Sequence, residues 1–190
     1  MHVVIINGSP RIQKYSNTDK IIRSFAKGLK ASGSTYELYC VSNRKEWDVA
    51  REAFLTGEQI IIVLPLYVEC LSSMLLEFLE SIPTERKRPA QLSFILHGGF
   101  DEGFQYRLGE RFLQSLPAQL GCTYGGCLIK GGSFFIRLSR ERAIRRLLDS
   151  YIPMGRLFIE HGNFNTPEAA KFTGPERYPW LLRIIVGMVI

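Results

Sequence analysis

The sequence predicts an α/β protein built on one parallel five-stranded sheet, with helices on both faces of that sheet. Apolar runs typical of buried strands alternate with segments whose apolar residues recur at helical spacing, and this alternation continues along most of the 190 residues. Right-handed crossovers leave few topologies for such a chain. The chain length favours the strand order 2-1-3-4-5 over a six-stranded dinucleotide-binding sheet.

Each strand of this prediction is a short apolar run that ends at a polar residue, a glycine or a proline. The strands are expected at residues 2–7, 36–41, 59–64, 92–96 and 127–130. The helices are expected where apolar residues repeat every three or four positions, at residues 21–29, 47–55, 71–79, 108–116 and 140–151. The last helix is interrupted at Pro153 and resumes to His161.

We expect residues 1–161 to form one domain and residues 162–190 to be an irregular extension, because Pro167, Gly174, Pro175 and Pro179 fall in that segment. The end of the extension, residues 180–190, is strongly apolar and is expected to pack on the core or on a partner subunit. No apolar run reaches the length that spans a bilayer, so no membrane span is predicted. A membrane contact of the tail is left as an alternative.

The net charge of +6 favours anionic ligands without choosing among them. The two basic clusters, residues 86–88 and 140–146, are interpreted as a solvated loop and a solvated helix face, so no nucleic-acid partner is expected. The four cysteines contain no C-x-x-C pair, which indicates neither a zinc site nor an iron–sulfur cluster. A reduced, cytoplasmic setting is therefore expected.

The first loop after a predicted strand has the residues of an anion site. Gly8-Ser9-Pro10-Arg11 leads to Ser16-Asn17-Thr18 at the start of a helix, where backbone N–H groups and hydroxyls bind anions. It matches neither the Walker sequence nor G-x-G-x-x-G. Its residues also fit a plain helix start in which Ser16 is the N-cap and Asp19 completes a capping box. The charge of Asp19 would oppose a phosphate.

Two further loops follow the third and fourth strands, at the edge where such sheets bind ligands. Pro65-Leu66-Tyr67-Val68 offers an aromatic ring and apolar groups for stacking on a flat ligand, although Tyr67 could instead pack on the neighbouring helix. Gly98 and Gly99 let the backbone approach a ligand. His97 is a candidate for the site or a hydrogen-bonded core histidine.

These three loops, in this order, resemble the NAD(P)H-dependent FMN reductase family of the flavodoxin-like superfamily. The resemblance implies a three-layer flavodoxin-like fold in which FMN binds at the loops. It implies that the FMN phosphate is surrounded by Ser9, Arg11, Ser16, Asn17 and Thr18. It further implies that the isoalloxazine ring contacts Pro65, Leu66, Tyr67, Val68, His97, Gly98 and Gly99.

The resemblance implies an FMN-dependent oxidoreductase that transfers hydride from NAD(P)H through FMN to a small-molecule acceptor such as a flavin, a quinone or a nitro or azo compound. The flavin supplies the redox chemistry, so no catalytic side chain is assigned. A homodimer is expected from the family and from the apolar tail. Two alternatives are a flavin-binding electron carrier without NAD(P)H oxidation and a flavin-free binding protein on the same fold.

Overall fold

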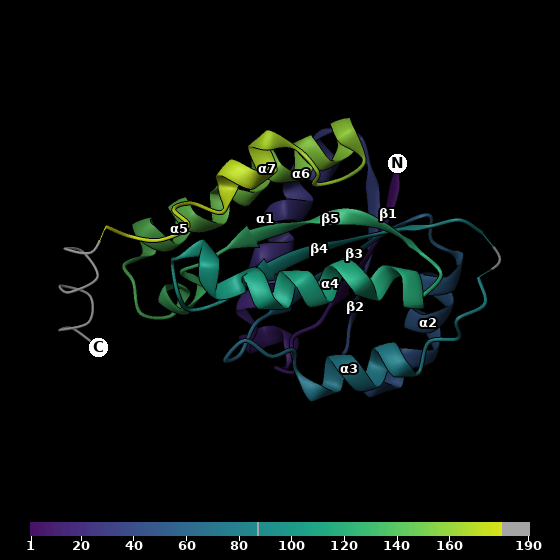
Figure 1. The fold of residues 1–190 in the computed structure, drawn as a ribbon. Coiled ribbons are helices and arrows are strands. Elements are labelled where there is room, and N and C mark those ends of the chain that lie inside the picture. Colours follow the sequence, from purple (N-terminus) through teal and green to yellow (C-terminus); the bar gives the residue numbers. More distant parts are fainter. Residues whose placement is uncertain (87, 180–190) are drawn as a thin grey trace.

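The computed structural model describes residues 1–86 and 88–179. They form three layers, with one parallel sheet between two layers of helices (Figure 1). The strand order is β2-β1-β3-β4-β5, with every neighbouring pair parallel. The predicted fold class and strand order are therefore confirmed. The strands are β1 (His2–Asn7), β2 (Thr35–Cys40), β3 (Gln59–Pro65), β4 (Gln91–His97) and β5 (Thr123–Lys130).

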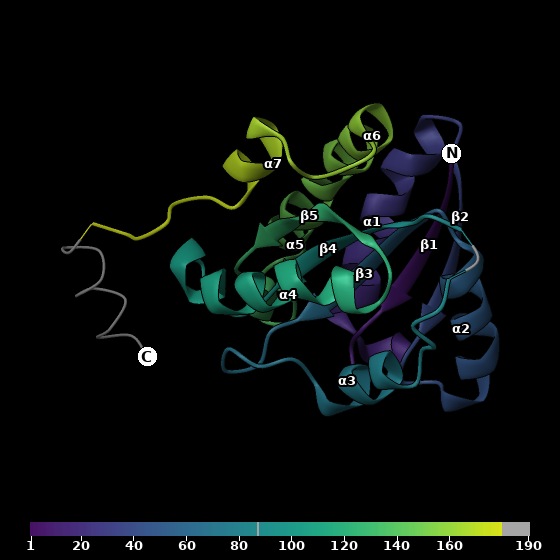
Figure 2. The same ribbon diagram turned by 45° about the vertical axis from the view of Figure 1, so that its right-hand side comes forward.

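Helices cover both faces of the sheet, as the two ribbon views show (Figures 1 and 2). One face is covered by α1 (Asn17–Ala31), α5 (Glu141–Asp149), α6 (Tyr151–His161) and α7 (Pro167–Phe172). The other face is covered by α2 (Trp47–Thr56), α3 (Ser73–Glu80) and α4 (Arg107–Gln119). Short 3-10 helices lie at η1 (Gln13–Tyr15), η2 (Arg44–Glu46), η3 (Gly103–Tyr106) and η4 (Ser133–Ile136).

The central strands are apolar along their length because each strand contributes to two cores. Successive side chains of a strand point to opposite faces. In β1, Val3 and Ile5 belong to the core under α1, whereas Val4 and Ile6 belong to the core under α2 and α3. This two-sided burial explains why the strands are continuous apolar runs rather than alternating ones.

Helices α1 and α6 cross at two glycines that allow unusually close backbone contact. A Cβ atom added to Gly28 would lie 2.1 Å from the carbonyl oxygen of Ile152. A Cβ atom added to Gly155 would lie 2.2 Å from the carbonyl oxygen of Phe25. Neither contact is possible with a side chain, so this pair of glycines allows α1 and α6 to pack this closely on each other.

The start of β5 differs from the prediction. The strand begins at Thr123, four residues before the expected start, and its pairing with β4 shifts register between Leu92 and Phe94. Gly125 and Gly126 lie at this irregularity, and Gly126 has a φ of 91°. The double glycine resembles a turn in the sequence, whereas here it forms a bulge in the strand.

The break between the last two predicted helical segments falls at a different residue. The chain leaves α5 at Asp149 and enters α6 at Tyr151, so the break lies at Ser150 rather than at Pro153. Pro153 sits in the first turn of α6. It is tolerated there because the first N–H groups of a helix have no partner within the helix.

Residues 162–179 are more ordered than the expected irregular extension, because they contain α7. Phe164 and Ala169 are buried in the core on the α1 side of the sheet. The N–H of Phe164 donates to the carbonyl of Gly125, and Lys130 Nζ donates to the carbonyl of Phe172. This part of the predicted extension packs on β5. The apolar end of the extension, residues 180–190, lies outside the described residues, and the domain boundary at 161 remains a prediction.

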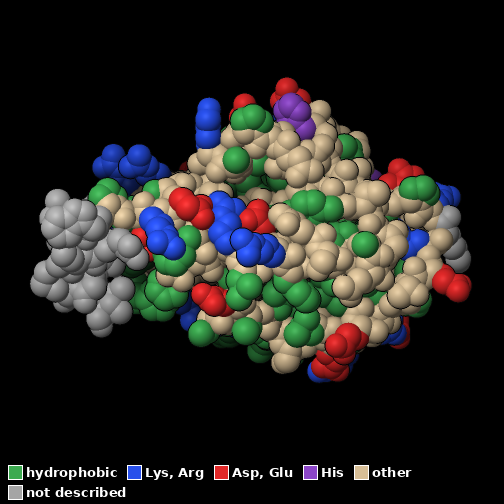
Figure 3. Space-filling view, in the orientation of Figure 1, with side chains coloured by type: hydrophobic (Ala, Val, Ile, Leu, Met, Phe, Trp, Pro, Cys, Tyr) green, Lys and Arg blue, Asp and Glu red, His purple; other side chains and the backbone are tan. Residues whose placement is uncertain are grey.

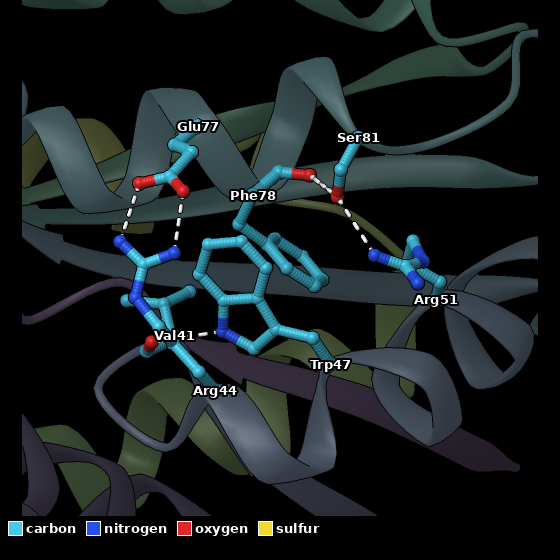
Figure 4. A network of polar contacts seen from close by, with 7 residues as sticks. All are labelled: Val41, Arg44, Trp47, Arg51, Glu77, Phe78 and Ser81. Atoms are coloured by element: carbon cyan, nitrogen blue, oxygen red, sulfur yellow. Dashed lines mark hydrogen bonds and ion pairs between the residues drawn. The ribbon is translucent and has the colours of Figure 1, made fainter.

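A polar network joins η2 and α2 to α3 (Figure 4). Both guanidinium nitrogens of Arg44 bond the Glu77 carboxylate, and the Arg44 guanidinium stacks over the Trp47 ring. Trp47 packs edge-on against Phe78 and donates to the carbonyl of Val41 at 2.9 Å. The contact therefore combines aromatic packing with a bidentate ion pair.

Basic side chains are distributed over several surfaces, and Figure 3 shows many of them beside acidic ones. Arg107, for example, pairs with both Glu110 and Glu176. Arg86 was expected in a solvated loop, but its guanidinium donates to the carbonyls of Phe54 and Gly57 at 2.7 Å each. Among the described residues, no helix has the length and hydropathy needed to cross a bilayer.

Candidate functional site

The carboxyl ends of β1, β3 and β4 open onto a cavity of ≈ 290 Å³. This is the edge of the sheet at which the strand order reverses, where ligands bind in such folds. All of the predicted site residues except Ser16 line this cavity. They are Ser9, Arg11, Asn17, Thr18, Pro65, Leu66, Tyr67, Val68, His97, Gly98 and Gly99. The structure thus brings together three loops that are far apart in the sequence.

Ser16 is the one predicted residue that does not line the cavity. It is buried as the N-cap of α1, and its hydroxyl accepts a hydrogen bond from the N–H of Asp19 at 3.3 Å. The capped helix start is therefore the correct interpretation of this hydroxyl. The Asp19 carboxylate accepts bonds from Gln13 Nε2 at 2.7 Å and from Arg23 Nε at 2.6 Å. These donors compensate the charge that would otherwise oppose an anion.

One end of the cavity is polar and rich in hydrogen-bond donors. Helix α1 begins at Asn17, and the N–H groups of its first turn, at Asn17 and Thr18, have no acceptor within the helix. The buried Ser9 lies beside them at the end of β1. Arg11 is exposed, and its guanidinium has no ion-pair partner in the described part of the chain. These groups together can bind an anion.

Asn17 carries an unmatched hydrogen-bond acceptor at the same end. Its Nδ2 donates to the carbonyl of Ser133 at 2.9 Å, which ties the start of α1 to η4. Its Oδ1 is the one buried side-chain polar atom without a hydrogen-bond partner among residues 1–86 and 88–179. Buried polar atoms are normally satisfied, so an unpaired one in a cavity wall points to a group that binds there.

His97 links the two sides of the cavity through hydrogen bonds at both ring nitrogens. Its Nε2 lies 2.9 Å from Thr18 Oγ1, and its Nδ1 lies 2.9 Å from Ser133 Oγ. The Ser133 hydroxyl and the Ser133 N–H both bond the carbonyl of Gly98, at 3.0 and 2.9 Å. Burial lowers the pKa of His97 to about 3, so the ring is neutral at physiological pH. His97 is thus a hydrogen-bonded core histidine and also part of the cavity wall.

The opposite rim of the cavity is apolar and exposed. Tyr67 and Cys70 exchange two backbone hydrogen bonds, at 3.0 and 2.9 Å, which close a tight turn. The two residues between them, Val68 and Glu69, have φ values of 47° and 63°. This left-handed conformation is costly for a β-branched residue such as valine, and the Val68 side chain is 92% exposed. The loop therefore holds an apolar side chain out toward solvent at an energetic cost.

Gly98 is required by packing behind the cavity. A Cβ atom added there would lie 2.8 Å from Cε1 of Tyr106, whose hydroxyl bonds the carbonyl of Phe100. Gly99 is different, because an added Cβ atom would meet Cβ of Phe134 at an ordinary 3.5 Å. Of the two glycines, Gly99 is therefore the one with open space on the cavity side. The sequence predicted that the backbone at both glycines could approach a ligand, and the space around them supports this for Gly99.

Three lining residues were missed by the sequence analysis: Ser133, Phe134 and Arg137. They lie on and just after η4, beyond the carboxyl end of β5. Arg137 donates to the carbonyl of Tyr15 at 2.6 Å and so reaches the first loop. The signal that could have found them is positional, since β5 lies next to β4 and its loop opens on the same edge. The sequence Gly131-Gly132-Ser133 marks that loop.

A larger and more open cavity of ≈ 710 Å³ lies between α5 and residues 173–178. It contains Lys130, whose ammonium has a lowered pKa because it is half-buried, and Asp101, whose carboxyl has a raised pKa for the same reason. None of the predicted site residues lines this cavity. Of these two cavities, the smaller one has both the hydrogen-bond donors suited to an anion and the apolar rim, and we take it as the candidate site.

No protein-family model matches the chain, and no curated protein is similar to it in sequence. Solved structures are similar to it in fold. An NADH:FMN oxidoreductase has a TM-score of 0.62 at 18% identity, with 92% of this chain and 96% of that chain covered. An NAD(P)H:quinone oxidoreductase from Methanothermobacter marburgensis has a TM-score of 0.58 at 16% identity, with 85% and 98% covered.

A third solved structure, general stress protein 14 from Treponema denticola in complex with FMN, has a TM-score of 0.59 at 7% identity. The matched region covers 84% of this chain and 97% of that chain. At these identities the likeness shows the fold. The sheet order, the two helical layers and these comparisons together identify this chain as a protein of the flavodoxin-like fold, the fold of the FMN reductases that its three loops resemble.

Proposed function

We propose that this chain is an FMN-dependent oxidoreductase that uses NAD(P)H to reduce a small-molecule acceptor. One observation carries the proposal: a single cavity has an anion-binding helix terminus at one end and an exposed apolar rim at the other. FMN has the same division, with a phosphate at one end and a flat ring system at the other. The structures that share the fold include reductases of this class and an FMN complex, which supports the proposal.

The polar end fits the phosphate and the ribityl chain. The first-turn N–H groups of α1, the Ser9 hydroxyl and the Arg11 guanidinium are donors that a phosphate requires. The unpaired Oδ1 of Asn17 is an acceptor, which suits a hydroxyl of the ribityl chain rather than the phosphate itself. This end therefore offers a partner for both kinds of group.

The rim fits a flat ring. Leu66 and Tyr67 lie on one side of the cavity, and Gly99 and Phe134 lie on the side formed by β4 and η4. FMN bound here would supply hydride and electron transfer between a reduced nicotinamide and the acceptor. The rim residues would position its ring and cover one of its faces. We assign no proton-transferring side chain, because the imidazole of His97 is enclosed and stays neutral at physiological pH.

The proposal is tested by adding FMN to the purified protein. We expect quenching of FMN fluorescence at a stoichiometry of one per chain, and oxidation of NADH or NADPH in the presence of a quinone, azo or nitro acceptor. Absence of FMN binding would overturn the proposal. Binding of FMN without NAD(P)H oxidation would instead favour an electron carrier, and comparing the two nicotinamides defines the preferred donor.

We also propose a homodimer in the cytoplasm. Large apolar side chains that line the cavity are exposed, including Tyr67 at 43% and Phe134 at 60%, and such clusters mark interaction surfaces. The cysteines are free thiols, which suits a reducing compartment. Light scattering after gel filtration tests the dimer, and a mass of one chain at micromolar concentration would contradict it.

A further inference from the structure

The hydrogen bonds through His97 can run in either of two directions, and the direction decides what Thr18 offers to a ligand. In the first direction, Ser133 Oγ donates to the carbonyl of Gly98, so its single proton is used there. Nδ1 of His97 must then carry the ring proton, because it can bond Ser133 Oγ only by donating to it. The neutral ring has its lone pair on Nε2, which accepts the proton of the Thr18 hydroxyl.

In this arrangement, all three hydrogen bonds are made, but Thr18 has no proton left for the cavity. Its hydroxyl presents lone pairs toward the place where an anion would bind. Lone pairs repel a phosphate, which accepts hydrogen bonds and donates few. The resemblance placed Thr18 at the phosphate, and this direction conflicts with that role.

The same atoms permit the opposite direction. If Nε2 carries the ring proton, it donates to Thr18 Oγ1, and the Thr18 proton is free for the anion. Nδ1 then accepts the proton of Ser133 Oγ. The carbonyl of Gly98 gives up that hydroxyl but keeps the Ser133 N–H, which donates to it at 2.9 Å. The second bond to this carbonyl is thus dispensable, and no buried group is left unpaired.

Resting on the proposed function, we propose that His97 is a positioning residue that reverses its tautomer when an anion binds at α1. It carries its proton on Nδ1 in the free protein and on Nε2 in the complex. The ring stays neutral and both hydroxyls keep one proton each, so no charge is gained or lost. Toward the ligand, the Thr18 hydroxyl changes from an acceptor to a donor. The change also reaches the carbonyl of Gly98, which loses its hydrogen bond from the Ser133 hydroxyl.

The tautomer is read directly from the ¹⁵N chemical shifts of the imidazole nitrogens. The chain has three histidines, and the signals of His97 are assigned by their loss in His97→Gln. We expect the Nδ1–H form in the free protein and the Nε2–H form with saturating FMN or with inorganic phosphate. Riboflavin, which lacks the phosphate, is expected to leave the Nδ1–H form in place.

Three variants test this arrangement. Ser133→Ala leaves Nδ1 without a partner, and an unpaired acceptor is tolerated better than an unpaired N–H, so we expect the Nε2–H form even without ligand. Thr18→Val, which removes the hydroxyl, should weaken FMN binding about tenfold or more and leave riboflavin binding unchanged. Thr18→Ser should restore FMN binding.

The outcomes separate the two proposals. FMN binding with the same tautomer before and after would overturn the reversal and leave the proposed function intact. Reversal by inorganic phosphate in a protein that binds no FMN would support the reversal and overturn the proposed function. An unchanged tautomer with FMN and with phosphate, or a free protein already in the Nε2–H form, would overturn the reversal.

Discussion

The two ends of the candidate cavity are built on opposite physical principles. At the polar end, buried side chains are held by hydrogen bonds that span the sheet, as in the chain from Thr18 through His97 to Ser133. At the rim, Val68 is almost fully exposed and its backbone is strained. The rigid end is suited to recognising one chemical group, whereas the exposed rim leaves room for different partners.

This contrast fits the roles that the proposal gives to the two ends. A phosphate is the same in every FMN molecule, so preformed donors can be fixed once. The nicotinamide and the acceptor reach the ring in turn from the open side, so that side must accept more than one shape. We therefore expect substitutions at the polar end to change stability and FMN affinity, and substitutions at the rim to change the choice of acceptor.

The largest expected effect is the acid sensitivity of the polar end. The pKa of His97 is about 3 in the folded protein because of burial, and about 6.5 in an unfolded chain. Between these values the unfolded chain binds a proton that the native state does not. The His97 contribution to stability is therefore complete above about pH 6.5 and is lost as the pH falls toward 3, by up to about 1.4 kcal/mol per pH unit.

Urea denaturation at pH 7, 6, 5 and 4 measures this slope. Other groups also titrate in this range, so the slope is compared with that of His97→Gln, which keeps a polar side chain and lacks the titration. We expect a steeper loss of stability in the unmodified protein. Equal slopes in the two proteins would show that the imidazole is not held neutral.

An intermediate effect is expected from Arg11→Gln at the polar end. The Arg11 guanidinium is exposed and unpaired among the described residues, so its removal should leave the free energy of unfolding within about 0.5 kcal/mol. Loss of a charge-assisted contact with the phosphate should weaken FMN binding about tenfold. Fluorescence titration measures both FMN and riboflavin, and riboflavin binding should not change.

Lys14→Gln is the matched control for that prediction. Lys14 lies in η1 of the same loop but does not line the cavity. Its substitution by glutamine removes the same positive charge as Arg11→Gln. A similar loss of FMN affinity in Lys14→Gln would mean that net charge alone, rather than a contact of Arg11, governs binding.

The smallest expected effect is at the rim. Val68→Asn replaces a β-branched residue at a φ of 47° with one that adopts this conformation more readily, so we expect a gain of about 0.5–1 kcal/mol in unfolding free energy. FMN affinity should change little, whereas the relative rates with different acceptors should change. A loss of stability would show that the turn is not strained by Val68.

The sheet and the position of the site could be predicted from the sequence because both depend on local patterns. Residues 59–64 are apolar on both faces, and the loops after Asn7, Pro65 and His97 contain the small, hydroxyl and aromatic residues that such an edge uses. The strand order followed from chain length and from the handedness of crossovers.

The remaining features depend on contacts between distant residues. Gly125 and Gly126 form a bulge because the residues on either side of them, Tyr124 and Cys127, pair with β4. Ser16 is a cap because its hydroxyl is used locally. Ser133 is bonded to His97, which lies 36 positions earlier in the chain. A pattern read along the sequence contains none of these pairings.

The crossing of Gly28 and Gly155 has a consequence for how this protein can diverge. Each glycine faces the backbone of the other helix, so neither position can gain a side chain unless the helices move apart. Such a movement would change how α1, whose first turn lies at the candidate anion site, packs against α6. Residues at the rim can therefore vary among related sequences, whereas positions 28 and 155 must both remain glycine for the two helices to pack as they do. In distantly related sequences, a pair of glycines on the first and sixth helices would be a more durable marker of this lineage than the loops that contact the ligand.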